Sequence, residues 1–167
     1  ADEKPLPGGV PVVQYFLAGA LTRDKQDAPA LAAARRAVEL DPANPLYESR
    51  LAWVHFHAQD LAKARQSYQE LLAKHNDNFK NSAIRDVVHD TRLALSNVAL
   101  KQADFAAAVE YLEQVLDEFP EDAGALNDLG YLWIERGLHL TRGVALAERA
   151  GAAHPGHPPY RDRPGGG

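Results

Sequence analysis

Prolines recur at the ends of Ala-rich helical segments, and their spacing constrains the fold more than any other feature of the sequence. Pro42, Pro120 and Pro155 end the segments AVELDP, VLDEFP and AGAAHP, and Asn76 ends LLAKHN in the same way. The intervals between these four residues are 34, 44 and 35. A period near 34 residues, built from paired amphipathic helices, is typical of helical solenoids. We therefore expect an all-α fold, a right-handed α-solenoid of about four helix-turn-helix repeats.

The repeat boundaries follow from this spacing. Apolar residues recur three, four and seven positions apart before each stop, which predicts an amphipathic helix there. Proline ends that helix because it disfavours helical geometry at the residue before it. The solenoid is expected over residues 11–155, with repeats at about 11–44, 45–78, 89–122 and 123–155.

The 44-residue interval contains an insertion at about 79–88. Ala83, Ile84, Val87 and Val88 fall at helical spacing within it, so we expect a helical insertion that lengthens the first helix of the third repeat. Two interpretations remain open. The added turns form either a longer helix with a solvated outer side or a projecting contact for a partner.

Both ends of the chain depart from the helical pattern. Residues 1–10 are expected to form a flexible arm, and residues 156–167 form a Pro/Gly-rich tail. A solenoid normally needs a polar helix over its last apolar face, and none is predicted after Ala153. Either the tail folds back over that face, with Tyr160 as a plug, or another molecule covers it.

Composition and charge exclude several classes of function. Neither Cys nor Met occurs, so a disulfide framework, a thiolate nucleophile and a Cys-based zinc site are ruled out. The formal net charge of −5 argues against a nucleic-acid partner. No apolar run approaches the roughly 20 residues that a bilayer span needs, so direct membrane insertion is not expected. The start Ala1-Asp2-Glu3-Lys4 favours export, periplasmic or extracellular, over a cytoplasmic location, although a trimmed chain would begin in the same way.

No catalytic, metal or cofactor site is expected, and the chain is interpreted as a non-enzyme. His55 and His57 are two positions apart and fall on different helix faces. Asp86, His89 and Asp90 come nearest to a catalytic cluster, but such spacing on a helix is more often a surface hydrogen bond. No Gly-rich loop that could cradle a phosphate precedes a helix.

Small residues and helix stops combine into a pattern that resembles the tetratricopeptide repeat (TPR) family. That family's 34-residue unit has Leu-Gly/Ala at positions 7–8, Ala at 20, an aromatic residue at 24 and Pro at 32. Positions 7–8 are filled here by Leu17-Ala18, Leu51-Ala52, Leu95-Ser96 and Leu129-Gly130; position 20 by Ala30, Ala64 and Ala108; position 24 by Tyr68. The segment NDLGYLW at 127–133 is similar to bacterial members. The sequence departs from the family at position 4, where the large residue is replaced by Gln14, Glu48 and Arg92 in the first three repeats.

The resemblance implies where a partner would bind. In TPR domains the first helix of each repeat lines a concave groove, and positions 2, 5, 9, 12 and 13 point inward. We expect a groove for a protein or peptide partner, with aromatic anchors and with Asn97 and Asn127 holding a peptide backbone. The alternative is that Trp53 and Phe56 pack partly against the insertion helix or a neighbouring repeat. The predicted groove residues are Tyr15, Arg23, Ser49, Trp53, Phe56, His57, Asn97, Lys101, Asn127, Tyr131 and Glu135.

Some chaperone-binding TPR domains grip a terminal carboxylate with Lys, Asn and Arg at positions 2, 5, 6 and 9 of successive repeats. Those places hold Tyr15, Gly19, Ser49 and Asp90 here, and Arg50 is an isolated match at a position 6. This basic clamp is therefore not expected.

Two functions follow from these surfaces. The first is a non-catalytic protein–protein interaction scaffold that binds a peptide or helix in the groove. The second is a structural subunit that stacks head-to-tail into a homo-oligomer or filament, because the end of the fourth repeat could contact the first repeat of another copy. The residues expected on the stacking face are Val144, Ala147 and Tyr160.

Overall fold

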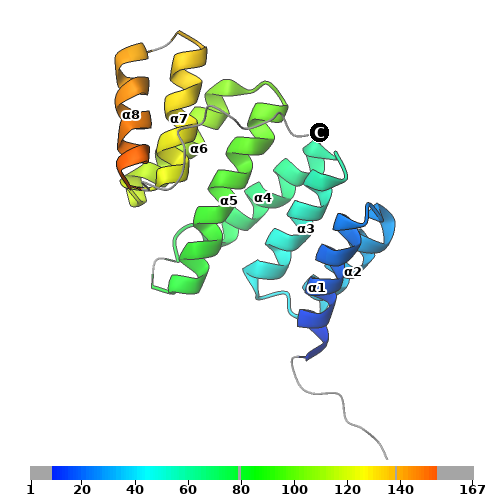
Figure 1. Ribbon diagram of the computed structural model, residues 1–167. Coiled ribbons are helices and arrows are strands. Elements are labelled where there is room, and N and C mark those ends of the chain that lie inside the picture. Colours follow the sequence, from blue (N-terminus) through cyan, green and yellow to red (C-terminus); the bar gives the residue numbers. More distant parts are fainter. Residues whose placement is uncertain (1–8, 79, 138, 154–167) are drawn as a thin grey trace, which may run out of the picture. The chain divides into compact units, whose positions relative to one another are not determined.

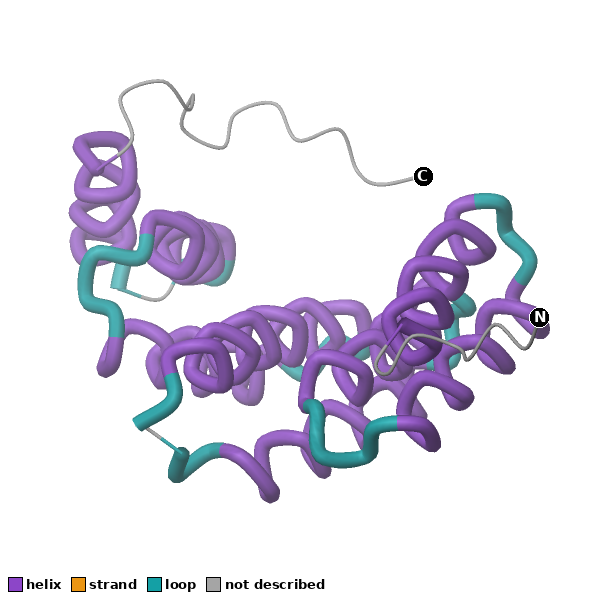
Figure 2. The backbone as a smooth tube through the Cα atoms, turned by 90° about the horizontal axis from the view of Figure 1, so that it is seen from below, coloured by secondary structure: helices purple, strands orange, loops and turns teal. Residues whose placement is uncertain are grey.

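The computed structural model describes residues 9–78, 80–137 and 139–153, and within these ranges the chain forms α-helices and no strand (Figures 1 and 2). The all-α fold class is therefore confirmed. Each helix overlaps one of the segments predicted from the repeat. The helices are α1 (Gly9–Arg23), α2 (Asp27–Leu40), α3 (Pro45–His57), α4 (Leu61–His75), α5 (Ser82–Lys101), α6 (Phe105–Glu118), α7 (Ala123–Glu135) and α8 (Leu140–Ala153).

The chain divides after Gln102 into two compact units. In the first unit α1 packs on α2 and α3 on α4, while α2 contacts α3 and α4 contacts α5. The first helices α1, α3 and α5 lie side by side in this unit (Figure 1). In the second unit α7 packs on both α6 and α8. The division falls between α5 and α6, the two helices predicted to form the third repeat.

The turn inside each repeat contains a residue in the left-handed backbone region. Lys25, Gln59 and Ala103 have φ angles of 57°, 62° and 58°. These positions are separated by the same 34 and 44 residues as the helix stops, so the turns repeat with the sequence pattern. Non-glycine residues adopt this conformation at a cost, so the conformation has to be maintained by the packing of the two helices that it joins.

The residue after each of these left-handed positions is the N-cap of the second helix of the repeat. Asp60 and Asp104 cap α4 and α6 by accepting a hydrogen bond from a backbone N–H three residues on, each at 3.2 Å. A side-chain cap of this kind satisfies a backbone donor that the helix itself cannot pair. Gln26 occupies the equivalent place before α2 and makes no side-chain cap.

The insertion lengthens α5. This helix has 20 residues, against 13 to 15 for every other helix. It begins after Asn81, whose side-chain oxygen accepts hydrogen bonds from the backbone N–H groups of Ala83 and Ile84 at 3.0 and 3.3 Å. The added N-terminal turns contribute Val88 to the core, so they are part of the packed helix.

Polar residues at position 4 bind the end of α4 in place of the family's large side chain. Glu48 on α3 forms ion pairs with Lys74 and His75, the second at 3.4 Å. Arg92 on α5 is buried and donates a hydrogen bond from Nη2 to Oδ1 of Asn76 at 2.8 Å. These contacts connect α3 and α5 to the C-terminal end of α4.

The predicted small residues lie where helices approach closely. Ala18, Ala30, Ala52 and Ala64 are fully buried. On α7, a Cβ atom added to Gly130 would lie 2.9 Å from the backbone oxygen of Gly143 on α8. Real Cβ atoms essentially never approach a neighbour so closely, so the spacing of α7 and α8 depends on these glycines.

We expect Gly130→Ala to destabilise the second unit by roughly 1–3 kcal/mol, because the new methyl group must push α7 away from the backbone of α8. Urea unfolding followed by circular dichroism measures the change in free energy of unfolding. Gly151→Ala, also on α8, is the matched control: nothing lies within 4 Å of its added Cβ, so it should be neutral or stabilising. Equal stability of Gly130→Ala and wild type would contradict this account of the α7–α8 contact.

Candidate functional site

Seven aromatic and cationic side chains form a continuous series of contacts across the first helices of the N-terminal unit. We call this set the aromatic–cationic row. It starts on α1, crosses α3 and ends on α5. In order of contact its members are Phe16, Tyr15, Arg50, Trp53, His57, Phe56 and Lys101.

Arg50 joins α1 to α3 at the centre of this row. Its guanidinium carbon lies 4.1 Å from the centre of the Tyr15 ring and 4.7 Å from that of Trp53, which is the geometry of a cation–π contact. Gly19 on α1 lies next to it, and a Cβ added there would lie 3.4 Å from Nη1 of Arg50, at ordinary van der Waals distance. Arg50 therefore occupies a slot with aromatic side chains around it and a glycine beneath it.

Arg50 has no hydrogen-bond or ion-pair partner in the part of the chain that the structure describes. Its Nε atom is buried and unpaired, although the side chain as a whole is only half-buried. A desolvated donor on a charged group is costly when no acceptor meets it. The buried Nε of Arg50 thus lacks an acceptor among the described residues, while the side chain as a whole is half-buried.

The α3–α5 part of the row is built around His57. Its ring centre lies 4.3 Å from that of Trp53 and 5.4 Å from that of Phe56. Lys101 on α5 places its Nζ 5.4 Å from the Phe56 ring centre. Burial lowers the pKa of His57 below its ordinary value, and the nearby charges of Lys101 and Arg50 lower it further. His57 is therefore neutral near pH 7, and the positive charge of the row comes from Arg50 and Lys101.

One side of the Trp53 side chain packs against the hydrophobic core. It packs against a buried cluster made of Ala18, Ala30, Ala33, Ala34 and Val54, most of which belongs to the first repeat. The inner surface of Trp53 therefore packs against a neighbouring repeat, which is one of the alternatives expected from the sequence. Only the rest of the half-buried ring is left for a partner.

The other predicted groove residues of the N-terminal unit lie outside these contacts. Ser49 on α3 is half-buried, and Arg23 is exposed at the C-terminal end of α1. Asn97 on α5 is exposed, but its Nδ2 donates to the carbonyl oxygen of Leu93 at 3.1 Å. One of its two N–H donors is therefore used within its own helix, and the other N–H and the side-chain oxygen remain for a peptide.

Three predicted groove residues belong to α7, in the C-terminal unit. Asn127 donates from Nδ2 to Oδ1 of Asp128 at 3.3 Å, Tyr131 is 38% exposed, and Glu135 is exposed at the end of the helix. On α8, Val144 is 47% exposed. Ala147 is half-buried, and its backbone nitrogen would lie 3.2 Å from a Cβ on Gly130, so it belongs to the α7–α8 contact. Tyr160 lies outside the described residues.

Arg50 and Phe16 are the residues that the sequence reasoning did not place in the site. In the sequence, Arg50 stands out only as an isolated match to one position of the basic carboxylate clamp. The signal that could have found it is Gly19, four residues after Tyr15 on the same face of α1. A glycine among inward-facing positions leaves space that a long side chain from the next repeat can fill.

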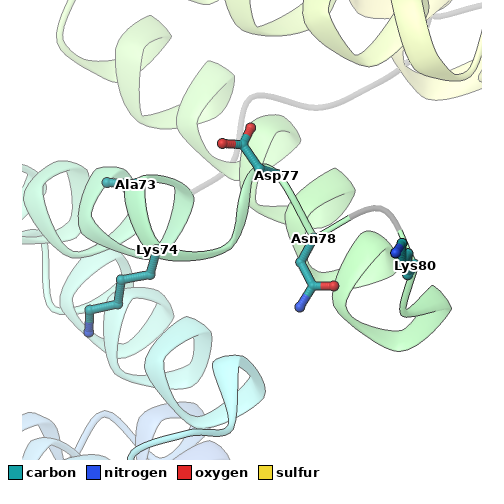
Figure 3. A pocket seen from close by; sticks show the side chains of 5 residues that line it. All are labelled: Ala73, Lys74, Asp77, Asn78 and Lys80. Carbon is teal, nitrogen blue, oxygen red and sulfur yellow. The ribbon is translucent and has the colours of Figure 1, made fainter.

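A shallow pocket of about 390 Å³ lies where α4 ends, away from the row (Figure 3). It is lined by Ala73, Lys74, Asp77, Asn78 and Lys80. In the close view the side chains of Lys74 and Asp77 point in different directions, so the charges do not converge on a common point (Figure 3). Lys74 is also paired with Glu48.

Neither a metal site nor a membrane span is found in the described ranges. No group of three or more His, Asp or Glu side chains there is placed to hold a metal ion. No helix among those residues is both long enough and apolar enough to cross a bilayer. Of the polar cluster considered from the sequence, His89 and Asp90 are in contact, with Nδ1 and Oδ1 3.0 Å apart.

A profile of the tetratricopeptide repeat matches residues 28–79 and 93–158, which is more than half of the chain. The chain belongs to the tetratricopeptide repeat family. Comparison with curated protein sequences gives no significant match. The TPR interpretation made from residues 11–155 is thereby confirmed, together with the helical-repeat solenoid fold.

Solved TPR structures share this fold at low sequence identity. MamA from Desulfovibrio magneticus RS-1 is 18% identical with a TM-score of 0.67, and the match covers 89% of this chain and 77% of that one. A TPR protein from Parabacteroides merdae is 18% identical with a TM-score of 0.71, covering 90% and 56%. YrrB, described as a TPR protein with an unusual peptide-binding site, is 19% identical with a TM-score of 0.61, covering 86% and 69%. At these identities the likeness shows the fold alone.

His55 replaces the Tyr that TPR units carry at position 11, and it is buried behind the row. Its side chain is 5% exposed and its Nδ1 has no partner among the described residues. Burial lowers the pKa of His55 from its ordinary 6.5, Lys63 and Arg35 lower it further, and Asp60 partly opposes them. His55 is therefore held neutral in the TPR fold.

This burial predicts a pH-dependent stability. Below about pH 6.5 the unfolded chain binds a proton at His55 that the folded chain does not, so stability is complete above this pH and falls as the pH is lowered. We expect His55→Gln to weaken this dependence, and the remainder to come in part from His57, whose pKa is shifted in the same direction. Urea unfolding at a series of pH values measures it, with the exposed His139→Gln as control. An unchanged pH profile in His55→Gln would refute the assignment.

Proposed function

We propose that this TPR protein is a non-catalytic interaction module that docks a peptide segment or helix on the face formed by α1, α3 and α5. The observation that carries the proposal is the aromatic–cationic row, which presents aromatic surface and two cations across three adjacent helices. Aromatic and Arg side chains supply most of the energy in protein interfaces, because they give large contact areas at low entropic cost.

The row is also ordered before a partner arrives. Each ring contacts its neighbour in the row, and Trp53 is packed from behind by the core. A surface whose side chains are already fixed loses little rotamer entropy on binding, which favours affinity. YrrB, a TPR protein described as having an unusual peptide-binding site, is consistent with this role for the fold.

The test is to select binders from a displayed library of short random peptides on the full chain and to measure them against variants. We expect Trp53→Ala and Phe56→Ala each to weaken the selected peptides about thirtyfold or more, as truncation of a central anchor does. Trp133→Ala, which removes the other Trp from α7, is the matched control and should leave affinity unchanged. Circular dichroism confirms that each variant is folded.

Intrinsic fluorescence gives a second readout because the chain has two Trp residues. Peptide binding should change the emission of Trp133→Phe, which retains Trp53, and leave that of Trp53→Phe unchanged. Peptides that bind folded Trp53→Ala and Phe56→Ala as tightly as wild type would exclude this face as the binding surface.

A second candidate function is head-to-tail stacking, and exposed apolar side chains at both ends of the repeat array favour it. Val10, Val13 and Leu17 are spaced along one face of α1, and Val13 is 60% exposed. Val144 on α8 is 47% exposed. Contiguous exposed apolar surface often marks an interaction site, and a heterologous contact between different faces of two copies need not close.

Stacking predicts a mass that rises with protein concentration, measured by light scattering after size exclusion. Val13→Glu and Val144→Glu should each return the mass toward the 18.2 kDa of one chain. Leu40→Glu on α2, at another exposed apolar position, should not. Ala147 is unsuitable for this test because it packs on α7. A wild-type mass that stays constant at all concentrations would remove the stacking function and leave the docking function standing.

A further inference from the structure

We propose that the slot of Arg50 receives a side-chain carboxylate, so that the partner of this face is a segment carrying an Asp or Glu next to an apolar residue. This inference rests on the proposed docking function and names the chemistry of its ligand. It starts from a half-buried guanidinium that has aromatic neighbours but no acceptor among the described residues.

Arg50 has no hydrogen-bond acceptor among the described residues, and its Nε is buried. A guanidinium has five N–H donors in a rigid planar fork, which matches the two oxygens of a carboxylate. Tyr15 and Trp53 offer it π surface, and neither ring contact provides the oxygen acceptors that its N–H groups require. A carboxylate arriving at the slot would supply them.

No acidic side chain on this face is available to accept hydrogen bonds from Arg50. Helix α1 contains no Asp or Glu at all. The acidic residue of α3, Glu48, pairs with Lys74 through Oε1, and its buried Oε2 lies 3.4 Å from Nε2 of His75. On α5, Asp90 contacts His89, and neither Asp86 nor Asp90 contacts any member of the row.

Charge complementarity points to the same ligand. Lys101, at the α5 end of the row, adds a second cation, and His57 between them is neutral near pH 7. An acidic segment is therefore attracted to this face, while its apolar residue packs on Trp53 or Phe56.

The aromatic neighbours favour Arg over Lys in this position. A planar guanidinium stacks on rings and keeps its edge available for hydrogen bonds, whereas an ammonium group cannot form the bidentate pair. The arrangement fixes the fork before a ligand arrives, which lowers the entropic cost of pairing.

The experiment extends the selection of random peptides on the full chain. The peptides are displayed with their C-termini joined to the carrier, so only side-chain carboxylates are available. We expect the recovered sequences to share an Asp or Glu beside an aromatic or aliphatic residue. Changing that acid to its amide in a synthetic copy should weaken binding to wild type about tenfold to a hundredfold, the range for a hydrogen-bonded charge pair.

A double-mutant cycle then assigns the acid to Arg50. The same acid-to-amide change should have no effect on binding to Arg50→Gln, and Arg50→Lys should recover only part of the affinity. Arg35→Gln, on the exposed side of α2, is the matched control and should retain the full wild-type effect. Urea unfolding of Arg50→Gln separates lost binding from a lost contact between α1 and α3.

The possible outcomes separate the carboxylate inference from the docking function on which it rests. Peptides that depend on Trp53 and Phe56 but show no acid preference would overturn the carboxylate inference and leave the docking function intact. An acid effect that persists in Arg50→Gln would also overturn it. Synthetic peptides that need a free C-terminal carboxylate instead of the internal acid would overturn the side-chain assignment. Peptides that bind independently of Trp53 and Phe56 would remove the docking function itself.

Discussion

The close approach of paired helices is the constraint on which the rest of this structure depends. Ala18, Ala30, Ala52 and Ala64 are fully buried, and Gly130 meets the backbone of α8 with no side chain between. Helices that pack this closely cannot tolerate larger residues without moving apart. The left-handed turn residues, such as Gln59 and Ala103, are accepted because the same packing fixes the helices on either side of them.

The candidate site also has a small residue, Gly19, where two helices meet. Arg50 of the next repeat lies beside this glycine. There the guanidinium joins Tyr15 to Trp53, and the row continues through His57 to α5. A surface able to hold a partner thus forms where α1 meets α3.

Much of the fold could be predicted from the sequence, but less of the site. Helix α4 ends at His75, directly before the stop predicted at Asn76, because such stops are local signals. Trp53, Phe56 and His57 were correctly grouped on α3, since the family pattern gives their register. The partners of Arg50 and the back-bonding of Asn97 to Leu93 depend on rotamers and on distances between helices, which no local pattern encodes.

By itself, the sequence determined the repeat: a period near 34 residues, the helix pairs, the small residues between them and the membership of the TPR family that these residues carry. These features are set by local propensity and periodicity, which act within a few helical turns. Only the tertiary structure decided which side chains meet across helices, above all that Arg50 lies over the rings of Tyr15 and Trp53 while its buried Nε has no acceptor among the described residues. That outcome depends on the spacing of α1 and α3, and the spacing is fixed only once both helices have packed.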